Sequence, residues 1–254
     1  MTALARRIAV KRVIDTVLVV LSAPLTIPLA LGTALAVRMK LGKPVLFKQV
    51  RIGLEEQSFT LLKFRSMLPE EDKNGNLLKP ADRMTSFGRT LRKTSLDELP
   101  QLLNILRGDM SLVGPRPLLP EYLPYYRRAE RARHSVRPGI TGPSQVGGRN
   151  ILTWDARLAC DAEYGRNGTL ADDLLILLRT VRKVVRSEGV NADLPATGIF
   201  LYHERAEEMR SLALRDLHAN DLACRVKWFN DPRMTPTMVF PDPITLEGTK
   251  SWFA

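Results

Sequence analysis

The strongest pattern in the chain is an apolar segment near its start, which covers residues 13–37 almost without interruption. A helix of this length could cross a hydrocarbon layer of about 30 Å. A secretory signal peptide fits poorly, because the run is too long and ends in RMKLGK rather than in a small-residue cleavage site. We therefore expect a membrane helix here.

Two prolines, Pro24 and Pro28, lie in the middle of this segment, where each removes a backbone donor and bends a helix. Basic residues flank the segment on both sides, and lysine and arginine are preferred on the cytoplasmic side of a membrane. The pattern thus favours a re-entrant hairpin, broken near Ser22 and Pro24, over a kinked spanning helix. Asp15 is expected to pair with a lysine or arginine one turn earlier, because an unpaired charge is costly there.

Shorter patterns follow along the chain. Two runs rich in β-branched and aromatic residues predict a β-hairpin over residues 44–67. Helical patterns follow at 82–93 and at 99–107, where a glycine ends the second helix. Residues 137–149 are rich in glycine and are expected to form a loop, and a further helix is expected from about 153 to 164.

The helix predicted over residues 170–187 has the clearest end signals. Thr169 can cap it, and acidic residues occupy its first turn and basic residues its last. Its apolar and basic residues segregate, which suits an amphipathic helix at a membrane surface and equally a core helix with a solvated basic face. Together the patterns predict an α+β fold that is mostly helical, with an N-terminal re-entrant membrane helix hairpin, a small β-hairpin and amphipathic interfacial helices.

The composition indicates which classes of binding partner suit the chain. The 254 residues carry a formal net charge of +11, which favours a polyanionic partner such as a phosphorylated substrate, an anionic membrane or nucleic acid. Aromatic residues make up 6% of the chain, so stacking platforms for single-stranded nucleic acid are scarce, and no nucleic-acid partner is predicted. The two cysteines lie far apart, which suits a reducing compartment.

Two adjacent carboxylates, Asp97 and Glu98, lie between a basic cluster and an apolar helical run. One interpretation is a helix cap, because Ser95 and Glu98 have the spacing of a capping box and acids suit a helix N-terminus. The other is chemistry, because Arg92 and Arg116 could hold phosphates while a carboxylate serves as nucleophile or metal ligand. The arginines are also expected to lower the pKa of the acids.

Several stretches resemble the bacterial sugar transferases, which are monotopic polyprenol-phosphate phosphoglycosyl transferases. They are KRVIDTVLVVLSAP, FKQVRIG, FTLLKFRSM, FGRTLRKTSLDELPQLLNILRGDMSLVGPRP, RHSVRPGITGPSQVGGRN and the helix over 170–189. The resemblance covers roughly residues 8–190 and implies that Asp97 and Glu98 form a catalytic dyad, which is compatible with a capping role.

The resemblance also implies a reaction. Asp97 would attack the β-phosphate of a UDP-sugar and release UMP, and polyprenol phosphate would then displace the phosphosugar from the enzyme. Glu98 would act as a base or organise the dyad, and Mg²⁺ bound at Asp97 would neutralise phosphate charge. In this family the membrane element is a re-entrant helix broken at a Ser-Pro region, which here falls on Ser22 and Pro24.

Seven residues are candidates for substrate binding: Lys63, Arg65, Arg92, Arg116, Arg137, Gln145 and Arg149. Lys63 and Arg65 alternate onto one face of the predicted strand, where the alternative is a solvated face. Arg92 and Arg116 match basic positions of the family, where the alternative is a structural ion pair. The other three belong to the glycine-rich segment and could hold the nucleotide, where the alternative is a plain turn.

Four segments are expected: a membrane helix with its flanks over 1–43, a phosphoglycosyl transferase domain over 44–190, a linker over 191–211, and residues 212–254. The last segment resembles the start of a GNAT-type acetyltransferase, and the alternative is a C-terminal extension. The predicted enzyme lies monotopically on the cytoplasmic face of a bacterial inner membrane.

The predicted reaction transfers the sugar-1-phosphate of a UDP-sugar, with an N-acetylated amino or diamino sugar expected, to undecaprenyl phosphate or a related polyprenol phosphate. The alternatives are hexose-1-phosphate transfer for exopolysaccharide and a non-catalytic membrane scaffold. Membrane lipid and a second copy of the chain in a homodimer are the other expected partners.

Overall fold

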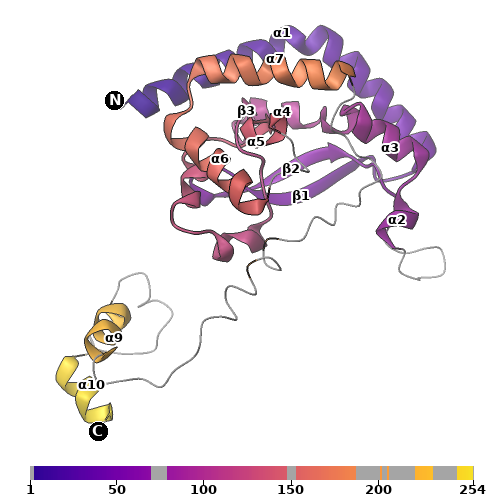
Figure 1. The fold of residues 1–254 in the computed structure, drawn as a ribbon. Helices are drawn as coiled ribbons and strands as arrows, with labels where there is room; N and C mark the ends of the chain where they lie inside the picture. Colours follow the sequence, from indigo (N-terminus) through magenta and orange to yellow (C-terminus); the bar gives the residue numbers. More distant parts are fainter. Residues whose placement is uncertain are drawn as a thin grey trace. The chain divides into compact units, whose positions relative to one another are not determined.

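The computed structural model of the protein describes residues 3–69, 79–147, 153–186, 201, 205, 221–230 and 245–253 (Figure 1). The chain divides into two compact units, Met1–Arg205 and Ala206–Ala254. In the second unit, helices α9 (Leu222–Phe229) and α10 (Leu246–Phe253) contact each other. Most of the acetyltransferase-like segment lies outside the described residues, so that resemblance stays a prediction.

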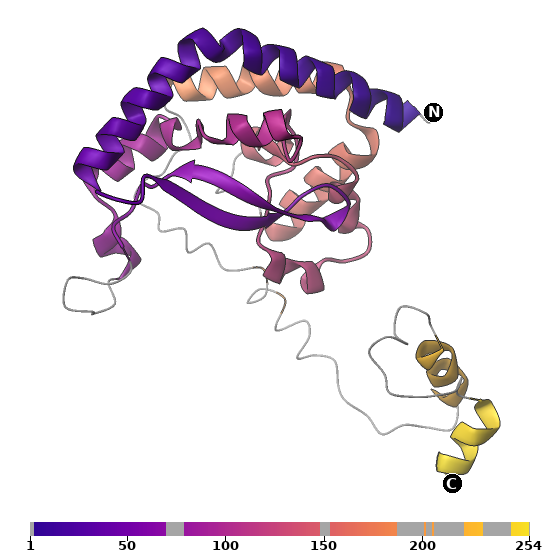
Figure 2. The ribbon, with the colours of Figure 1, turned by 180° about the vertical axis from the view of Figure 1, so that it is seen from behind.

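Helix α1 (Ala3–Lys40) runs through the whole apolar segment as one continuous helix. Figures 1 and 2 show that it is bent into an arch above the rest of its unit. Pro24 and Pro28 lie inside it and donate no backbone hydrogen bond to the preceding turn. The Ser22 hydroxyl donates to the Val19 carbonyl over 2.9 Å, a local bond that often accompanies bending. The predicted break near Ser22 and Pro24 is therefore a bend within an unbroken helix.

The arch of α1 is packed on both sides of its bend and exposed between them. Val19 packs in one core cluster, and Val37 and Leu41 pack in another. Between these positions, Leu21 and Leu25 are 71% and 75% exposed. Among the described residues, α1 is the one helix long and apolar enough to span a membrane. An exposed apolar surface on a helix, where most backbone groups are bonded internally, is suited to lipid.

The predicted β-hairpin is confirmed. Strands β1 (Leu46–Ile52) and β2 (Ser58–Phe64) pair antiparallel, with Leu46 opposite Phe64, and the 3-10 helix η1 (Leu54–Glu56) lies between them. A second sheet, which the sequence analysis missed, pairs β3 (Ser111–Val113) parallel with β4 (Gly139–Thr141). Three-residue strands are too short to show an alternating pattern.

Close backbone packing explains part of the glycine-rich segment. A Cβ atom at Gly139 would lie 2.1 Å from the backbone nitrogen of Gly114, and one at Gly114 would lie 2.3 Å from the Arg137 carbonyl oxygen. No side chain fits at such distances, so both positions require glycine. The segment predicted as a loop thus contains β4 and the short helix α5 (Pro143–Val146).

The described part of the first unit contains eight further elements. They are α2 (Pro80–Arg83), α3 (Ser86–Lys93), η2 (Leu96–Glu98), α4 (Gln101–Arg107), η3 (Pro120–Tyr125), η4 (Glu130–Ser135), α6 (Trp154–Asn167) and α7 (Leu170–Arg186). The predicted helix over 82–93 is split in two, because the Thr85 hydroxyl accepts from the Gly88 N–H over 3.0 Å and starts α3. The helix predicted at about 153–164 corresponds to α6.

Helix α7 confirms the predicted cap and has both a buried side and an exposed apolar stripe. The Thr169 hydroxyl accepts from the Asp172 N–H, and the Asp172 carboxylate accepts from the Thr169 N–H. The helix lies beside α1 in both views (Figures 1 and 2). Leu174 and Leu178 form an apolar stripe that is about 60% exposed, whereas Ile176 is buried in the core. One face of α7 is therefore core and another presents leucine to the surroundings.

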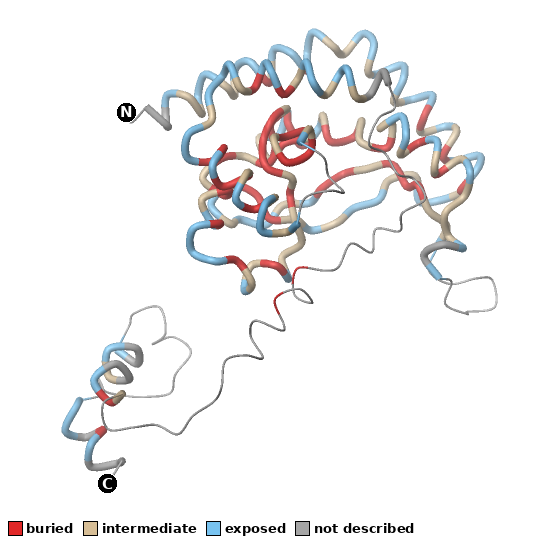
Figure 3. Tube along the Cα trace, in the orientation of Figure 1, coloured by how far each residue is buried: buried red, intermediate tan, exposed pale blue. Residues whose placement is uncertain are grey.

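The predicted ion pair of Asp15 with Lys11 or Arg12 is not formed, although the charge of Lys11 acts on the Asp15 carboxylate. Lys11 forms an ion pair of 2.6 Å with Asp173 of α7, and Arg12 donates to two carbonyls at the end of α4. Asp15 instead accepts from the backbone N–H of Leu112 over 3.2 Å. These polar groups hold the first arm of α1, the part of the helix before the bend, against the core. Buried residues concentrate in that core, below α1 (Figure 3).

Asn104 joins helix α4 to the hairpin. Its side chain is fully buried, and its Oδ1 atom accepts from the Leu62 N–H over 3.0 Å. Its Nδ2 atom donates to the carbonyl of Thr60 over 2.8 Å and to Asp109 over 3.0 Å. The amide thus takes the place of a neighbouring strand and fixes α4 against β2, the strand that carries Lys63.

Candidate active site

The acidic pair lies on η2, between α3 and α4 and under the second arm of α1. Leu96 and Leu99, on either side of the pair, pack against the cluster that contains Val37. Ser95 has a left-handed backbone with φ of 57° and makes no side-chain capping bond. The predicted capping box is therefore wrong, because a capping residue needs an extended backbone. The second arm of α1 fixes the position of the pair instead.

Five predicted residues meet here from four parts of the fold. Lys63 extends from β2, Arg92 from the end of α3, Asp97 and Glu98 from η2, and Arg116 from the loop after β3. Lys63 Nζ lies 2.7 Å from Glu98 Oε1, and Arg116 Nη1 lies 3.9 Å from the same oxygen. Glu98 thus organises two cations that surround the pair.

Burial dominates the electrostatics of Asp97, which is 7% exposed. Burial raises the pKa of its carboxyl, and the charge of Glu98 acts in the same direction. Lys63, Arg92 and Arg116 lower the pKa, but the net direction is upward. The predicted lowering is therefore wrong for Asp97, since loss of water and the charge of Glu98 together outweigh the attraction of the cations. A poorly solvated carboxylate of this kind is suited to act as a nucleophile.

Arg92 is held by a neutral partner rather than by an acid. Its Nε atom donates to the Ser66 hydroxyl over 2.9 Å. Burial lowers the pKa of the guanidinium, Asp97 raises it, and Arg116 lowers it again. The bond to Ser66 orients the guanidinium beside Asp97 without neutralising it.

Arg51 on β1 is a neighbour of Arg116 that sequence reasoning missed. It donates to Gln49 over 2.6 Å and to the Pro117 carbonyl over 3.4 Å. Burial and the charge of Arg116 lower the pKa of its guanidinium to about 10. The sequence could have indicated Arg51, because it lies in FKQVRIG, one of the stretches that resemble the family. Arg51 therefore adds a further cation beside Arg116, next to the three cations that act on Asp97.

The other predicted substrate residues have different surroundings. Arg65 is 8% exposed and donates to the carbonyls of Leu41 and Lys43, so it closes the end of α1. Arg137 donates to the Gly108 carbonyl over 2.8 Å, at the end of α4. These bonds indicate structural roles for both arginines. Arg149 lies outside the described residues.

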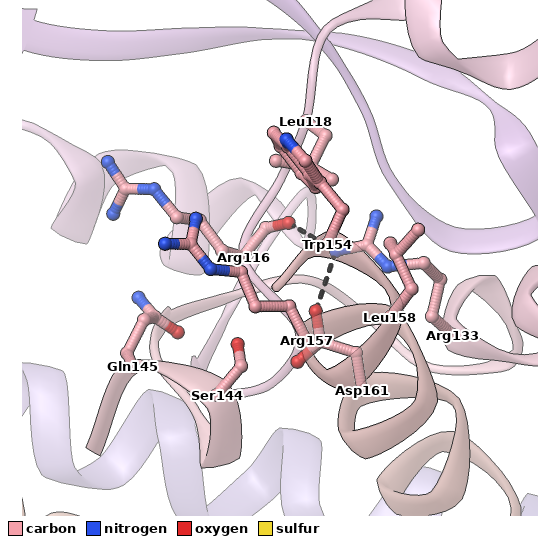
Figure 4. A pocket seen from close by; sticks show the side chains of 9 residues that line it. All are labelled: Arg116, Leu118, Arg133, Ser144, Gln145, Trp154, Arg157, Leu158 and Asp161. Carbon is pink, nitrogen blue, oxygen red and sulfur yellow. Dashed lines mark hydrogen bonds and ion pairs between the residues drawn. The ribbon is translucent and has the colours of Figure 1, made fainter. Parts of the chain in front are cut away.

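Gln145 lines a cavity next to Arg116, together with Ser144 and residues of α6 (Figure 4). Its Nε2 atom donates to the Ile140 carbonyl over 2.8 Å, and its buried Oε1 atom has no hydrogen-bond partner among the described residues. A buried acceptor without a partner favours a ligand or water that donates to it. The sequence analysis missed the α6 side of this cavity, formed by Trp154, Arg157, Leu158 and Asp161.

Arg133 also lines the cavity. It donates to the backbone carbonyl of Arg116 over 2.7 Å and to Asp161 over 2.9 Å (Figure 4). Both side chains of this ion pair are almost fully buried. Arg133 therefore fixes the backbone from which Arg116 reaches the acidic pair.

Comparison with known proteins identifies the family of the chain. A sequence profile of the family named bacterial sugar transferase matches residues 6–187. The chain therefore belongs to the bacterial sugar transferase family, and it is a phosphoglycosyl transferase enzyme.

Three relatives cover most of the same region. The uncharacterized sugar transferase EpsL of Bacillus subtilis is 51% identical over 180 residues, which cover 71% of this chain and 89% of the relative. The UDP-glucose:undecaprenyl-phosphate glucose-1-phosphate transferase of Caulobacter vibrioides is 43% identical, over 70% of this chain and 71% of the relative. The exopolysaccharide production protein ExoY of Sinorhizobium fredii is 37% identical, over 70% of this chain and 87% of the relative.

Proposed function

We propose that this enzyme transfers the sugar-1-phosphate of a UDP-sugar to polyprenol phosphate through a covalent intermediate on Asp97. The observation that carries the proposal is the acidic pair, with Asp97 buried, among Lys63, Arg92 and Arg116 beneath the apolar arch of α1. Cations beside a desolvated carboxylate suit a diphosphate substrate, and the membrane arch suits a lipid acceptor.

The proposed first step forms a bond between an Asp97 oxygen and the β-phosphorus of the donor. The phosphoanhydride bond to the α-phosphate breaks, and its electron pair leaves with UMP. Arg92 and Arg116 neutralise the growing charge on the phosphate oxygens. Glu98 keeps Lys63 and Arg116 in place, since one of its oxygens contacts both.

The proposed second step regenerates the enzyme. A phosphate oxygen of polyprenol phosphate attacks the phosphorus of the acyl phosphate, the bond to Asp97 breaks, and the carboxylate returns to its starting state. Splitting one difficult transfer into two displacements at a single carboxylate is the usual advantage of nucleophilic catalysis.

The predicted Mg²⁺ fits the carboxylates of this site only when phosphate oxygens of the substrate complete its ligands. Among the described side chains, no group of three or more His, Cys, Asp or Glu residues could hold a metal ion. Asp97 and Glu98 offer two carboxylates, which matches the usual Mg²⁺ site of one or two carboxylates completed by phosphate oxygens and water. Bound there, the ion would neutralise charge on the diphosphate.

For the donor sugar, the Caulobacter and Sinorhizobium relatives favour the hexose alternative. The name of the first refers to glucose-1-phosphate transfer and that of the second to exopolysaccharide production. We propose a UDP-hexose or its N-acetylated derivative as the donor, and a panel that contains UDP-glucose, UDP-galactose and their 2-acetamido forms distinguishes the two.

The experiment that tests the proposed function omits the acceptor. Purified full-length protein mixed with Mg²⁺ and the correct UDP-sugar should release about one UMP per enzyme in a burst, and its mass should rise by one sugar phosphate. Addition of undecaprenyl phosphate should then start steady turnover. A reaction that needs the lipid before any UMP appears would contradict the covalent intermediate, and no UMP from any donor would contradict the reaction.

For the membrane, we propose that the arch of α1 enters and leaves the cytoplasmic leaflet on the same side. Arg6 and Met39 lie near the two ends of α1 and are exposed. In a background with Cys160→Ser and Cys224→Ser, Arg6→Cys and Met39→Cys should both react with an impermeant maleimide in inside-out vesicles. Neither should react in sealed right-side-out vesicles. Reaction of the two sites from opposite sides would instead support a spanning helix.

A further inference from the structure

Two residues beyond the region that matches the family are buried in the first unit. Leu201 is fully buried, and Arg205 is 4% exposed. The family match ends at residue 187, and both positions fall within the segment predicted as a linker. A linker residue that only joins two units has no reason to be buried, so these two contacts have a role in the first unit.

Leu201 completes an aromatic and aliphatic cluster. It packs with Tyr122 and Tyr126 of the η3 region and with Leu158 of α6. Trp154 packs against the same cluster and meets Tyr122 edge to face, with ring centroids 5.3 Å apart. Trp154 and Leu158 also line the Arg116 cavity. Leu201 thus packs against the same side chains, Trp154 and Leu158, that line the cavity.

Arg205 makes a second, ionic connection to the same layer. Its guanidinium donates to both carboxylate oxygens of Glu130, over 2.8 Å and 2.6 Å, and to Asp155 over 2.6 Å. It also donates to the Tyr125 carbonyl. Glu130 is 6% exposed, so loss of the arginine would leave a buried carboxylate without its two-pronged partner.

Both connections lead to Arg116. Glu130 lies on η4 one turn before Arg133, which holds the Arg116 carbonyl and Asp161. Leu158 lies on α6 one turn before Asp161. Arg205 therefore fixes one partner of the buried Arg133–Asp161 pair through η4, and Leu201 fixes the other through α6.

We propose that Leu201 and Arg205 form an anchor that holds the wall of the Arg116 cavity in place, and that they act as positioning residues for the donor. The first, structural part of this proposal, that the two residues anchor the cavity wall, depends only on the packing and the ion pairs. The part that concerns the donor rests on the proposed function, since it takes the cavity and Arg116 to bind the UDP-sugar.

Hydrogen–deuterium exchange on the full-length protein in detergent tests the structural part. Leu201→Ala and Arg205→Ala should each accelerate exchange of amides over 120–135 and 154–162 by about tenfold, because the wall opens more often. The exposed Arg128→Ala is the matched control and should change nothing. Leu201→Ala leaves no charge unpaired, so it decides the question even where Arg205→Ala folds poorly. Unchanged exchange in Leu201→Ala would overturn the anchor.

Kinetics test the positioning part. The same two variants should raise the KM for the UDP-sugar by about five- to tenfold while kcat stays within about twofold, since the nucleophile itself is untouched. Arg205→Lys should lower the raised KM only slightly, because a lysine cannot donate to both oxygens of Glu130 as the guanidinium does. Faster exchange with an unchanged KM would overturn the positioning role. Failure of the wild type to release UMP would overturn the proposed function, while the exchange result would still decide on the anchor.

Discussion

The variant Asp97→Asn should lose UMP release by roughly a thousandfold or more and yet unfold at a temperature no lower than the wild type. The loss follows from removal of the nucleophile. The retained stability follows from burial, which raises the pKa of Asp97 in the folded protein above its ordinary value. Above that raised pKa the ionised carboxylate favours the unfolded chain, and an amide of the same shape carries no such charge.

UMP release and thermal unfolding, measured in the same detergent near neutral pH, check both halves of this expectation. Asp82→Asn, at an exposed aspartate of α2, is the matched control and should alter neither quantity. Retained UMP release would return Asp97 to a structural role. A clear fall in unfolding temperature would mean that the cations around Asp97 stabilise its charge more than burial destabilises it.

The variant Lys63→Met should move the acidic limb of the pH–rate profile to higher pH. Lys63 is the cation that most lowers the pKa of Asp97, so its removal leaves that pKa higher still. The nucleophile must be ionised, and a larger fraction of the enzyme is then inactive at each acidic pH. Near neutral pH we also expect kcat/KM to fall by about tenfold to a hundredfold, because Glu98 loses its 2.7 Å partner.

The check is kcat/KM measured from mildly acidic to mildly alkaline pH for wild type, Lys63→Met and Lys48→Met. Lys48 lies on β1 of the same hairpin, is exposed, and serves as the control for loss of a charge. A lower rate with an unshifted limb would show that Lys63 supports the site without acting on the ionisation of Asp97.

The sequence predicts which residues lie together where a motif and a local pattern agree. Lys63 and Arg116 lie far along the chain from the segment that holds Arg92, Asp97 and Glu98, and the structure brings all five together. The hairpin and the Thr169 cap are also confirmed, because each depends on residues close in sequence.

Features that depend on tertiary packing were predicted less well. The direction of the Asp97 pKa shift depends on how much water is excluded, which the neighbouring arginines in the sequence do not reveal. Arg65 and Arg137 have the right charge for a phosphate, yet backbone carbonyls at two helix ends bind them. The sheet of β3 and β4 rests on close backbone approach at Gly114 and Gly139, which leaves no periodic pattern.

The bend in α1 also bears on how concentration should be defined for the two proposed substrates. The exposed leucines of the bend would lie among lipid tails, while η2 is packed against the second arm of the same helix. A lipid acceptor would then reach Asp97 by lateral diffusion within one leaflet, whereas the nucleotide arrives from solution. The rate of the second step would depend on the mole fraction of acceptor in the bilayer. At a fixed amount of acceptor, added bulk lipid would lower this mole fraction and slow the second step, just as added water dilutes a soluble substrate.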